Sequence, residues 1–252
     1  MILGVDIGNT TIYFGVIDNN EVVKSFRITT KKDITEEEYE IVIKNVLEEN
    51  IEKDKIDGII IASVVPEVTS ELEQALTNVI GVKPVIAQRD VVTNLGADPE
   101  NIKVVGTDII CNSVGAKIKY KLPVIIFDMG TATTCMVVDE QGIFRGGMVC
   151  PGLKTSVNAL ISNASQLSNF PLGNPKNMIG MDPPECINAG VIYGHSSMIN
   201  GLKTRIEKET GSKYTVVLTG GNSDYVKDYI DKDIIVDKNL IFYGLNELYK
   251  NI

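Results

Sequence analysis

Asp6-Ile7-Gly8-Asn9-Thr10-Thr11 follows an apolar run at residues 1–5, and Asp128-Met129-Gly130-Thr131-Ala132-Thr133-Thr134 follows a second apolar run at residues 124–127. Each apolar run is typical of a buried strand, and a second strand rich in β-branched residues follows each turn. The two stretches are therefore copies of one unit, made of a strand, a tight turn and a second strand. Their separation by about half the chain predicts a duplicated fold.

The residue types in both turns suit the binding of phosphate. Glycine lets the backbone approach a ligand closely, backbone N–H groups and threonine hydroxyls can donate to phosphate oxygens, and the aspartate can hold Mg²⁺ or its bound water. A single Asp-x-Gly string also ends many ordinary strands, so each copy alone has a purely structural interpretation. A further strand runs into Thr219-Gly220-Gly221, and the three turns together favour a nucleotide-binding fold.

The order of the predicted elements repeats in the two halves. In the first half we expect strands at about 2–6, 11–17, 21–27, 58–64 and 83–87, with helices at 36–49, after Pro66 and at 108–119. In the second half we expect strands at about 123–128, 133–139, 143–149, 214–218 and 233–236, with helices after Pro151-Gly152, at 184–209, between 218 and 233, and at 240–250. Thr35 and Glu38 predict a capping box for the first helix.

Both halves thus follow the order βββαβαβα, in which the two successive helices of the second half, after Pro151-Gly152 and at 184–209, take the place of the first helix. Because βαβ crossovers lie over a mostly parallel sheet, this order predicts two α/β domains, at 1–120 and 121–252. We expect the ligand to bind in the cleft between the two domains.

Composition limits the classes of partner. The 252 residues carry a net charge of -9, with basic residues scattered among acidic ones, so we expect no nucleic-acid partner. No run approaches the roughly 18 apolar residues of a membrane-spanning helix, and the start lacks the features of a signal peptide. We therefore expect a cytoplasmic protein with no membrane partner.

Histidine and cysteine chemistry is limited as well. The single histidine, His195, excludes a site built from several histidines, and the four cysteines show no paired metal-binding spacing. We expect the cysteines to be reduced structural thiols. Any reaction must then depend on carboxylates, hydroxyls and a metal.

The duplicated order and the Asp-Gly-Thr turns resemble the superfamily of actin, Hsp70 and sugar kinases, whose domains have the ribonuclease-H-like fold. Within it, the chain is most similar to the type III pantothenate kinase family, over nearly its whole length. The resemblance depends on the order and spacing of six motifs: 6–11, Gly106-Thr107-Asp108, 128–134, 146–152, Thr219-Gly220-Gly221, and Asn239-Leu240 with Gly244-Leu245.

The resemblance implies an enzyme that transfers the γ-phosphate of ATP to a hydroxyl of pantothenate, the first step of coenzyme A biosynthesis. It also implies Mg²⁺ between the phosphates and Asp6, a potassium or ammonium ion near Asp128, and a homodimer. The apolar residues of the predicted helix at 184–209 fit a dimer face and an ordinary core equally well. The residues implied to bind ATP and its phosphates are Asp6, Ile7, Gly8, Asn9, Thr10, Thr11, Gly130, Thr131, Thr219, Gly220 and Gly221.

Asp108 matches the carboxylate that accepts the proton of the attacking hydroxyl in this family. Without the resemblance, an aspartate at the start of a predicted helix is ordinarily an N-cap. Phosphoryl transfer needs positioning and charge neutralisation more than covalent chemistry, so two phosphate turns, a metal and one carboxylate suffice.

The acceptor side departs from the family pattern. The implied substrate-binding residues are Gly106, Thr107, Asp108, Ile109 and Pro183, but the family has arginine where this chain has Ile109 and threonine where it has Pro183. An expected upstream aromatic residue is replaced in Asn94-Leu95-Gly96-Ala97. Loss of a buried charge partner typically costs about 2–5 kcal/mol, enough to change the acceptor. The alternatives are a kinase for another small alcohol, such as a polyol, sugar or nucleoside, and a non-catalytic regulatory homologue.

Overall fold

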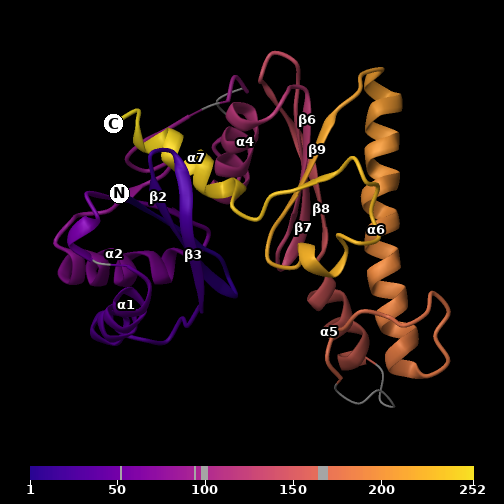
Figure 1. The fold of residues 1–252 in the computed structure, drawn as a ribbon, viewed down its shortest axis with the longest axis horizontal. Coiled ribbons are helices and arrows are strands. Elements are labelled where there is room, and N and C mark those ends of the chain that lie inside the picture. The colour runs from indigo at the N-terminus through magenta and orange to yellow at the C-terminus, as the bar shows by residue number, and fades with distance from the viewer. Residues whose placement is uncertain (52, 94, 98–101, 164–169) are drawn as a thin grey trace. The chain divides into compact units, whose positions relative to one another are not determined.

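The computed structural model describes residues 1–51, 53–93, 95–97, 102–163 and 170–252. Within them the chain forms two compact units, each with its own five-stranded sheet (Figure 1). Unit 1 contains Met1–Lys119 and Asn239–Ile252, and unit 2 contains Tyr120–Lys238. The sequence predicted domains at 1–120 and 121–252, whereas these units assign the last helix to unit 1. Leu240, Phe242 and Leu245 of that helix are fully buried.

The sheet of unit 1 has the strand order β3-β2-β1-β4-β5. The middle strand β1 pairs antiparallel with β2 and parallel with β4, and the two edge strands are β3 and β5. The strands are β1 (Ile2–Ile7), β2 (Thr11–Asp18), β3 (Glu21–Thr29), β4 (Gly58–Ser63) and β5 (Val85–Ile86).

Helices cover both faces of this sheet, with α1 and α2 on one face and α4 and α7 on the other (Figure 1). Successive side chains of β1 point to opposite faces of the sheet and so contact both helix layers. Val5 and Ile7 pack toward α1 and α2, while Ile2 packs toward α4 and α7. The helices are α1 (Glu36–Asn50), α2 (Pro66–Ile80), α4 (Thr107–Lys119) and α7 (Leu240–Tyr249), with a short 3₁₀ turn η1 (Lys53–Lys55).

Unit 2 repeats the topology, with the strand order β10-β9-β6-β7-β8. Helices α5 and α6 pack against one face, around the fully buried Phe127, Met129 and Leu153. The elements are β6 (Val124–Met129), β7 (Ala132–Val138), β8 (Phe144–Pro151), α5 (Leu153–Asn163), α6 (Pro183–Thr210), β9 (Thr215–Thr219), η2 (Ser223–Tyr225) and β10 (Ile235–Val236).

Most predicted elements are confirmed, and one is wrong. The capping box of α1 is present, because Thr35 Oγ1 accepts from Glu38 N and Glu38 Oε2 accepts from Thr35 N. The helix predicted between 218 and 233 is only the 3₁₀ turn η2. Ser223 donates from both its N–H and its hydroxyl to the Gly220 carbonyl. Most of the following backbone bonds join residues three apart, and a single bond, from the Lys227 N–H to the Ser223 carbonyl, joins residues four apart, so no regular α-helix forms.

Among the described residues, no helix is long and apolar enough to span a bilayer. The four cysteines are free thiols, of which Cys111 and Cys135 are buried, Cys150 is half-buried and Cys186 is exposed.

Candidate active site

The first predicted phosphate turn connects β1 to β2 in unit 1. The Gly8 N–H donates to the Thr11 carbonyl at 3.0 Å and closes the turn, which leaves Asn9 and Thr10 exposed at its tip. Thr30 holds the turn from outside, since its hydroxyl donates to the Gly8 carbonyl at 2.7 Å and its N–H donates to the Thr10 carbonyl at 3.0 Å. The turn is therefore fixed at its base and accessible at its tip.

Asp6 lies at the end of β1 on the face that α4 covers. Its neighbours Val5 and Ile7 pack toward α1 and α2, so alternation directs the Asp6 side chain to the opposite face. The pKa of the buried Cys111 thiol on α4 is raised well above its usual value, by burial first and then by the negative charges of Asp6 and Asp108. Both predicted carboxylates therefore lie near one thiol within unit 1.

Asp108 is in the first turn of α4, where two features hold its carboxylate. Asp108 Oδ1 accepts from the Ile109 N–H at 2.9 Å. A Cβ on Gly106 would lie only 2.5 Å from that oxygen, so the glycine makes room for the carboxylate to fold back over the helix start. Burial raises the pKa of Asp108, and backbone hydrogen bonds oppose part of that rise. The carboxylate is thus fixed in direction and made more basic.

In unit 2, the turn after β6 is held by backbone contacts. The Gly130 N–H donates to the Ala132 carbonyl, and the Gly152 N–H donates to the Thr131 carbonyl. Asn222 fastens the same turn with two bonds, from its N–H to the Met129 carbonyl and from Nδ2 to the Gly130 carbonyl, both at 2.9 Å.

The Thr219-Gly220-Gly221 turn lies directly against Asp128. Asp128 pairs with Thr219 in the sheet, and Gly220 has a φ of +90°. A Cβ on Gly220 would lie 2.4 Å from Asp128 Oδ1, so only glycine fits there. Two of the predicted turns are therefore adjacent in unit 2.

The remaining predicted site residues have less specific surroundings. Ile7 is fully buried, so its side chain is part of the core. Thr107 begins α4 and Ile109 is half-buried there, while Pro183 is exposed at the start of α6, whose N-cap is Asp182. Asn94 lies outside the described residues.

Sequence reasoning missed several residues that shape the two turns. Thr30 holds the unit 1 turn, Asn222 holds the unit 2 turn, and Thr155 donates from its hydroxyl to the Thr131 carbonyl at 2.6 Å. Asn222 directly follows the Thr-Gly-Gly string, so its position was a usable signal. Thr30 and Thr155 lie 20 or more residues from the groups they bind, and no local pattern marks them.

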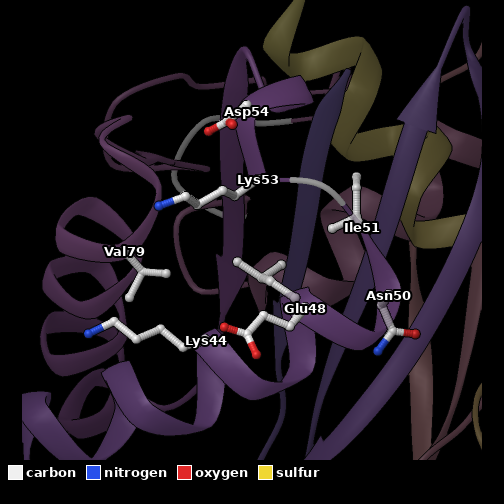
Figure 2. A pocket seen from close by; sticks show the side chains of 8 residues that line it. Lys44, Glu48, Asn50, Ile51, Lys53, Asp54 and Val79 are labelled. Carbon is white, nitrogen blue, oxygen red and sulfur yellow. The ribbon is translucent and has the colours of Figure 1, made fainter.

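A hollow of about 660 Å³ lies elsewhere in unit 1, between the last turns of α1 and α2 (Figure 2). Leu47 and Val79, both almost fully buried, belong to its lining together with charged side chains such as Lys44 and Glu48. None of the predicted site residues lines this hollow, so it provides no support for the predicted chemistry.

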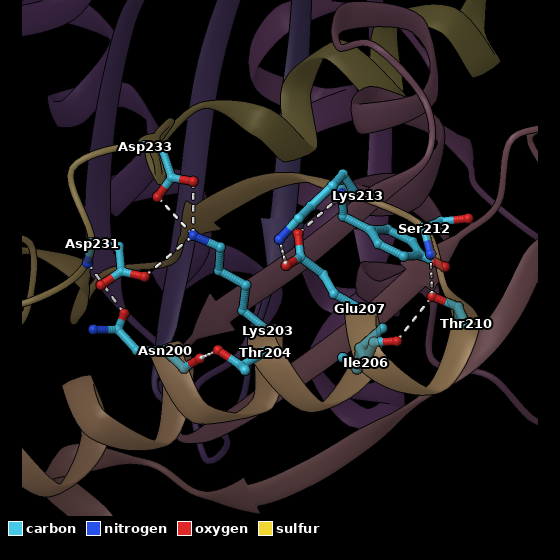
Figure 3. Close-up of polar contacts among 11 residues, drawn as sticks. Asn200, Lys203, Thr204, Ile206, Glu207, Thr210, Ser212, Lys213, Asp231 and Asp233 are labelled. Atoms are coloured by element: carbon cyan, nitrogen blue, oxygen red, sulfur yellow. Dashed lines mark hydrogen bonds and ion pairs between the residues drawn. The ribbon is translucent and has the colours of Figure 1, made fainter.

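An ion-pair network fixes the loop before β10 to helix α6 in unit 2 (Figure 3). The Lys203 ammonium contacts both Asp233 oxygens at 2.7 Å and Asp231 Oδ2 at 3.2 Å. Burial works against the charge of Lys203, but the hydrogen bonds to Asp233 and Asp231 outweigh it and raise the pKa of the amine. This network stabilises the loop and involves none of the predicted site residues.

Two sheets of the same strand order, each with an aspartate and a glycine turn after its first strand, define the duplicated ribonuclease-H-like fold of actin-like ATPases. The family model described as type III pantothenate kinase matches residues 2–205. The chain belongs to the type III pantothenate kinase family.

Individual relatives agree with this assignment. The chain is 35% identical to a type III pantothenate kinase from Exiguobacterium sp., covering 99% of this chain and 98% of the relative. It is 34% identical to one from Agathobacter rectalis, covering 99% and 97%. Among solved structures, it resembles a protein from Campylobacter jejuni described as a Baf family transcriptional activator, with a TM-score of 0.58, 18% identity, and coverage of 99% and 98%. At that identity the structural likeness shows the fold alone.

Proposed function

We propose that the protein transfers the γ-phosphate of ATP to a hydroxyl of pantothenate, the first step of coenzyme A biosynthesis. Membership of the type III pantothenate kinase family supports this reaction. The observation that carries the chemistry is that Asp108 is held at the start of α4 by the Ile109 N–H, while the negative charges of Asp6 and Asp108 both raise the pKa of Cys111 on that helix.

Asp108 is the proposed general base. It accepts the proton of the acceptor hydroxyl as the oxygen attacks the γ-phosphorus of ATP, and the bond between that phosphorus and the bridging oxygen breaks to release ADP. Burial raises the pKa of Asp108, which makes its carboxylate a stronger base. The Ile109 N–H, which donates to Oδ1, orients the carboxylate.

The two turns are the proposed sites of the ATP phosphates. In unit 1 the exposed tip of the turn offers Asn9 and Thr10, and Gly8 and Thr11 form its base. In unit 2 the turn offers Gly130 and the exposed Thr131. The proposal also assigns nucleotide contacts to Ile7, through its backbone, and to Thr219, Gly220 and Gly221.

Asp6 is the proposed ligand of Mg²⁺, through its bound water. Hard cations prefer oxygen ligands, and Asp6 provides a carboxylate next to the amide and hydroxyl oxygens of its turn. Among the described residues, no group of three or more His, Cys, Asp or Glu side chains is arranged to hold a metal, so phosphate oxygens would complete the ligand set. Mg²⁺ bound there would neutralise charge on the phosphates during transfer.

Asp128 is the proposed ligand of a potassium or ammonium ion. Its carboxylate lies against Gly220, where a Cβ would be only 2.4 Å from Oδ1, so the backbone of the Thr219-Gly220-Gly221 turn approaches the carboxylate closely. We further propose that the protein is a cytoplasmic homodimer, on the family resemblance alone.

Position 109 supports a second candidate, a kinase of the same fold for another small alcohol. The family arginine would pair with the carboxylate of pantothenate, whereas this chain has the uncharged Ile109 there and Pro183 in place of the family threonine. A polyol, sugar or nucleoside has no carboxylate and would not need the arginine. The regulatory alternative is disfavoured, because two carboxylates held beside one buried thiol are costly to keep in a scaffold without a reaction.

The test is a measurement of ADP release from ATP with Mg²⁺ and potassium, with pantothenate in parallel with polyols, sugars and nucleosides. Release that depends on pantothenate is the expected result. Release only with another acceptor would favour the second candidate, and no release with any acceptor would favour the regulator.

Variants at position 109 sharpen this test. If the carboxylate of pantothenate lies beside this position, Ile109→Arg should lower the KM for pantothenate by about 30-fold or more. This estimate assumes that adding a charge partner for the carboxylate gains as much binding free energy as removing one costs. Ile109→Met, which adds no charge, should leave the KM unchanged. Equal KM values in both variants would argue against a carboxylate at this position.

A further inference from the structure

One cationic side chain contacts the unit 1 turn and has no part in the reaction described so far. The Lys32 ammonium lies 3.5 Å from Asn9 Oδ1, at the exposed tip of the turn. It also forms an ion pair with Glu67 Oε1 at 2.8 Å. Glu67 is in the first turn of α2, so Lys32 connects the tip of the turn to a helix on the same unit.

The backbone after β3 places Lys32 beside the unit 1 turn. Thr30 binds the carbonyls of Gly8 and Thr10, which fastens the chain after β3 along the turn. Lys32 follows two residues later, and its flexible stem reaches the Asn9 amide. The lysine is therefore beside the turn because the chain is fixed there, and Glu67 is its partner in this conformation.

The ion pair between Lys32 and Glu67 is easy to exchange. The two side chains are 46% and 49% exposed, and ion pairs between exposed groups contribute little stability. Phosphate oxygens, like carboxylate oxygens, accept charge-assisted hydrogen bonds from a lysine ammonium. A nucleotide at the turn would thus compete with Glu67 for the ammonium.

The negative charge of the site favours this exchange. The nearby carboxylates Asp6 and Asp108 repel a polyphosphate, and one Mg²⁺ does not neutralise both them and the phosphates. Nucleotide-binding sites commonly add a lysine that contacts the phosphates directly. Lys32 is the cation that the described contacts bring to the tip of this turn.

We propose that Lys32 is a nucleotide-binding residue that exchanges its ion pair with Glu67 for an ion pair with a phosphate oxygen when ATP binds. This inference rests on the proposed function of the turn. In a purely structural role, Lys32 would only link the segment after β3 to α2.

The test compares Lys32→Met with Lys44→Met by calorimetric titration with ATP and Mg²⁺. Lys44 is a matched control, because it forms an exposed ion pair with Glu40 at 3.1 Å on α1, away from the turn. Loss of a charge-assisted hydrogen bond should weaken ATP binding by about 10- to 100-fold in Lys32→Met, with Lys44→Met unchanged. Lys32→Arg, which keeps the charge, should bind within a few-fold of the native protein.

Two further measurements separate a nucleotide-binding role from a structural one. If Lys32 binds nucleotide, the melting temperatures of Lys32→Met and Lys44→Met without nucleotide should be alike, and the KM for the acceptor should change much less than the KM for ATP. Equal ATP affinity in Lys32→Met and the native protein would overturn the inference while leaving the proposed function intact. Absence of ATP binding by the native protein would remove both.

Glu67→Gln tests the exchange itself. Because Glu67 competes with phosphate for the same ammonium, its neutralisation should leave ATP binding as tight as before or tighter. Binding at least tenfold weaker in Glu67→Gln would show that Glu67 positions the lysine instead, and would overturn the proposed exchange.

Discussion

The two units share one strand order but connect their fourth and fifth strands by different means. In unit 1 the connection is α2, a helix of 15 residues that buries Val68, Leu72 and Leu76. In unit 2 it is the three-residue turn η2 and an irregular loop, which the buried Lys203 fastens to α6. Both connections pack apolar side chains into a core, since Val226 and Ile234 of the unit 2 connection are buried, and the ion pair of Lys203 is an addition in unit 2. The sheet order is therefore common to both units, whereas the connection can be a helix or a turn and a loop.

The phosphate turns differ in a second respect. The turn of unit 1 lies near two carboxylates and a lysine, whereas the turn of unit 2 is held mostly by backbone hydrogen bonds around Asp128. We therefore expect substitutions near the unit 1 turn to affect chemistry and charge most, and substitutions that disturb the backbone of the unit 2 turn to affect stability as well as nucleotide binding.

The largest effect is expected for Asp108→Asn in unit 1. Loss of a general base should lower kcat by about 10²- to 10⁴-fold, while the KM for ATP changes little. Steady-state kinetics would measure both values. A kcat within threefold of the native value would show that Asp108 has only a structural role in the first turn of α4.

The same variant should not lose stability. Burial raises the pKa of Asp108 in the folded state above its value in the unfolded state. The ionised carboxylate therefore lowers the free energy of unfolding at a pH above the folded-state pKa, and protonation removes this loss. Asp108→Asn should therefore be at least as stable as the native protein at pH 7, with the difference vanishing as the pH falls below the unfolded value of about 4. Urea denaturation at several pH values would test this, and a less stable variant at pH 7 would contradict it.

A smaller effect is expected for Gly220→Ala in unit 2. A positive φ strains any other residue, and the added Cβ would collide with Asp128, so we expect a loss of about 2 kcal/mol. Gly221→Ala is the matched control, because nothing lies within 4 Å of its Cβ position. Urea denaturation of both variants would measure the difference, and equal stability would contradict the geometry of this turn.

The smallest effect is expected for Lys203→Met, which breaks the network in Figure 3. The side chains of Asp231 and Asp233 are 48% and 68% exposed, so solvent screens the lost pair and the cost should be about 1 kcal/mol at pH 7. Lys213→Met is the control, since Lys213 is 89% exposed beside Glu207.

The pH dependence of that cost has a definite sign. The hydrogen bond from Lys203 lowers the pKa of Asp233, so its contribution is present above the unfolded value of about 4 and is lost as the pH falls through the folded value. The stabilities of the native protein and Lys203→Met should converge in acid. A difference that persists at low pH would mean that the lysine stem, not its charge, stabilises the loop.

Local patterns predicted most of the fold. The apolar strands before each turn, the capping box of α1 and the start of α6 near Pro183 could all be read from neighbouring residues. Two features could not. Local hydrogen bonds at Ser223 replaced an expected helix with a turn, and α7 packs with unit 1, although it follows unit 2 in sequence.

Some features of the site could likewise be predicted from the sequence, and others could not. The family resemblance implied that Asp6 and Asp108 act at one site, and in the structure the charges of both raise the pKa of one thiol, Cys111. Contacts between distant residues, such as those of Thr30 with Gly8 and of Lys32 with Glu67, depend on the folded arrangement and leave no periodic signal. The roles of these residues in catalysis and binding remain predictions.

The most direct test of the central claim is to incubate the native protein and Asp108→Asn with ATP, Mg²⁺, potassium and pantothenate, and to identify the product by mass spectrometry. We expect a phosphate monoester of pantothenate with the native protein, formed at least a hundredfold more slowly with Asp108→Asn. Absence of this ester with the native protein, or its formation at equal rates with both proteins, would contradict the account.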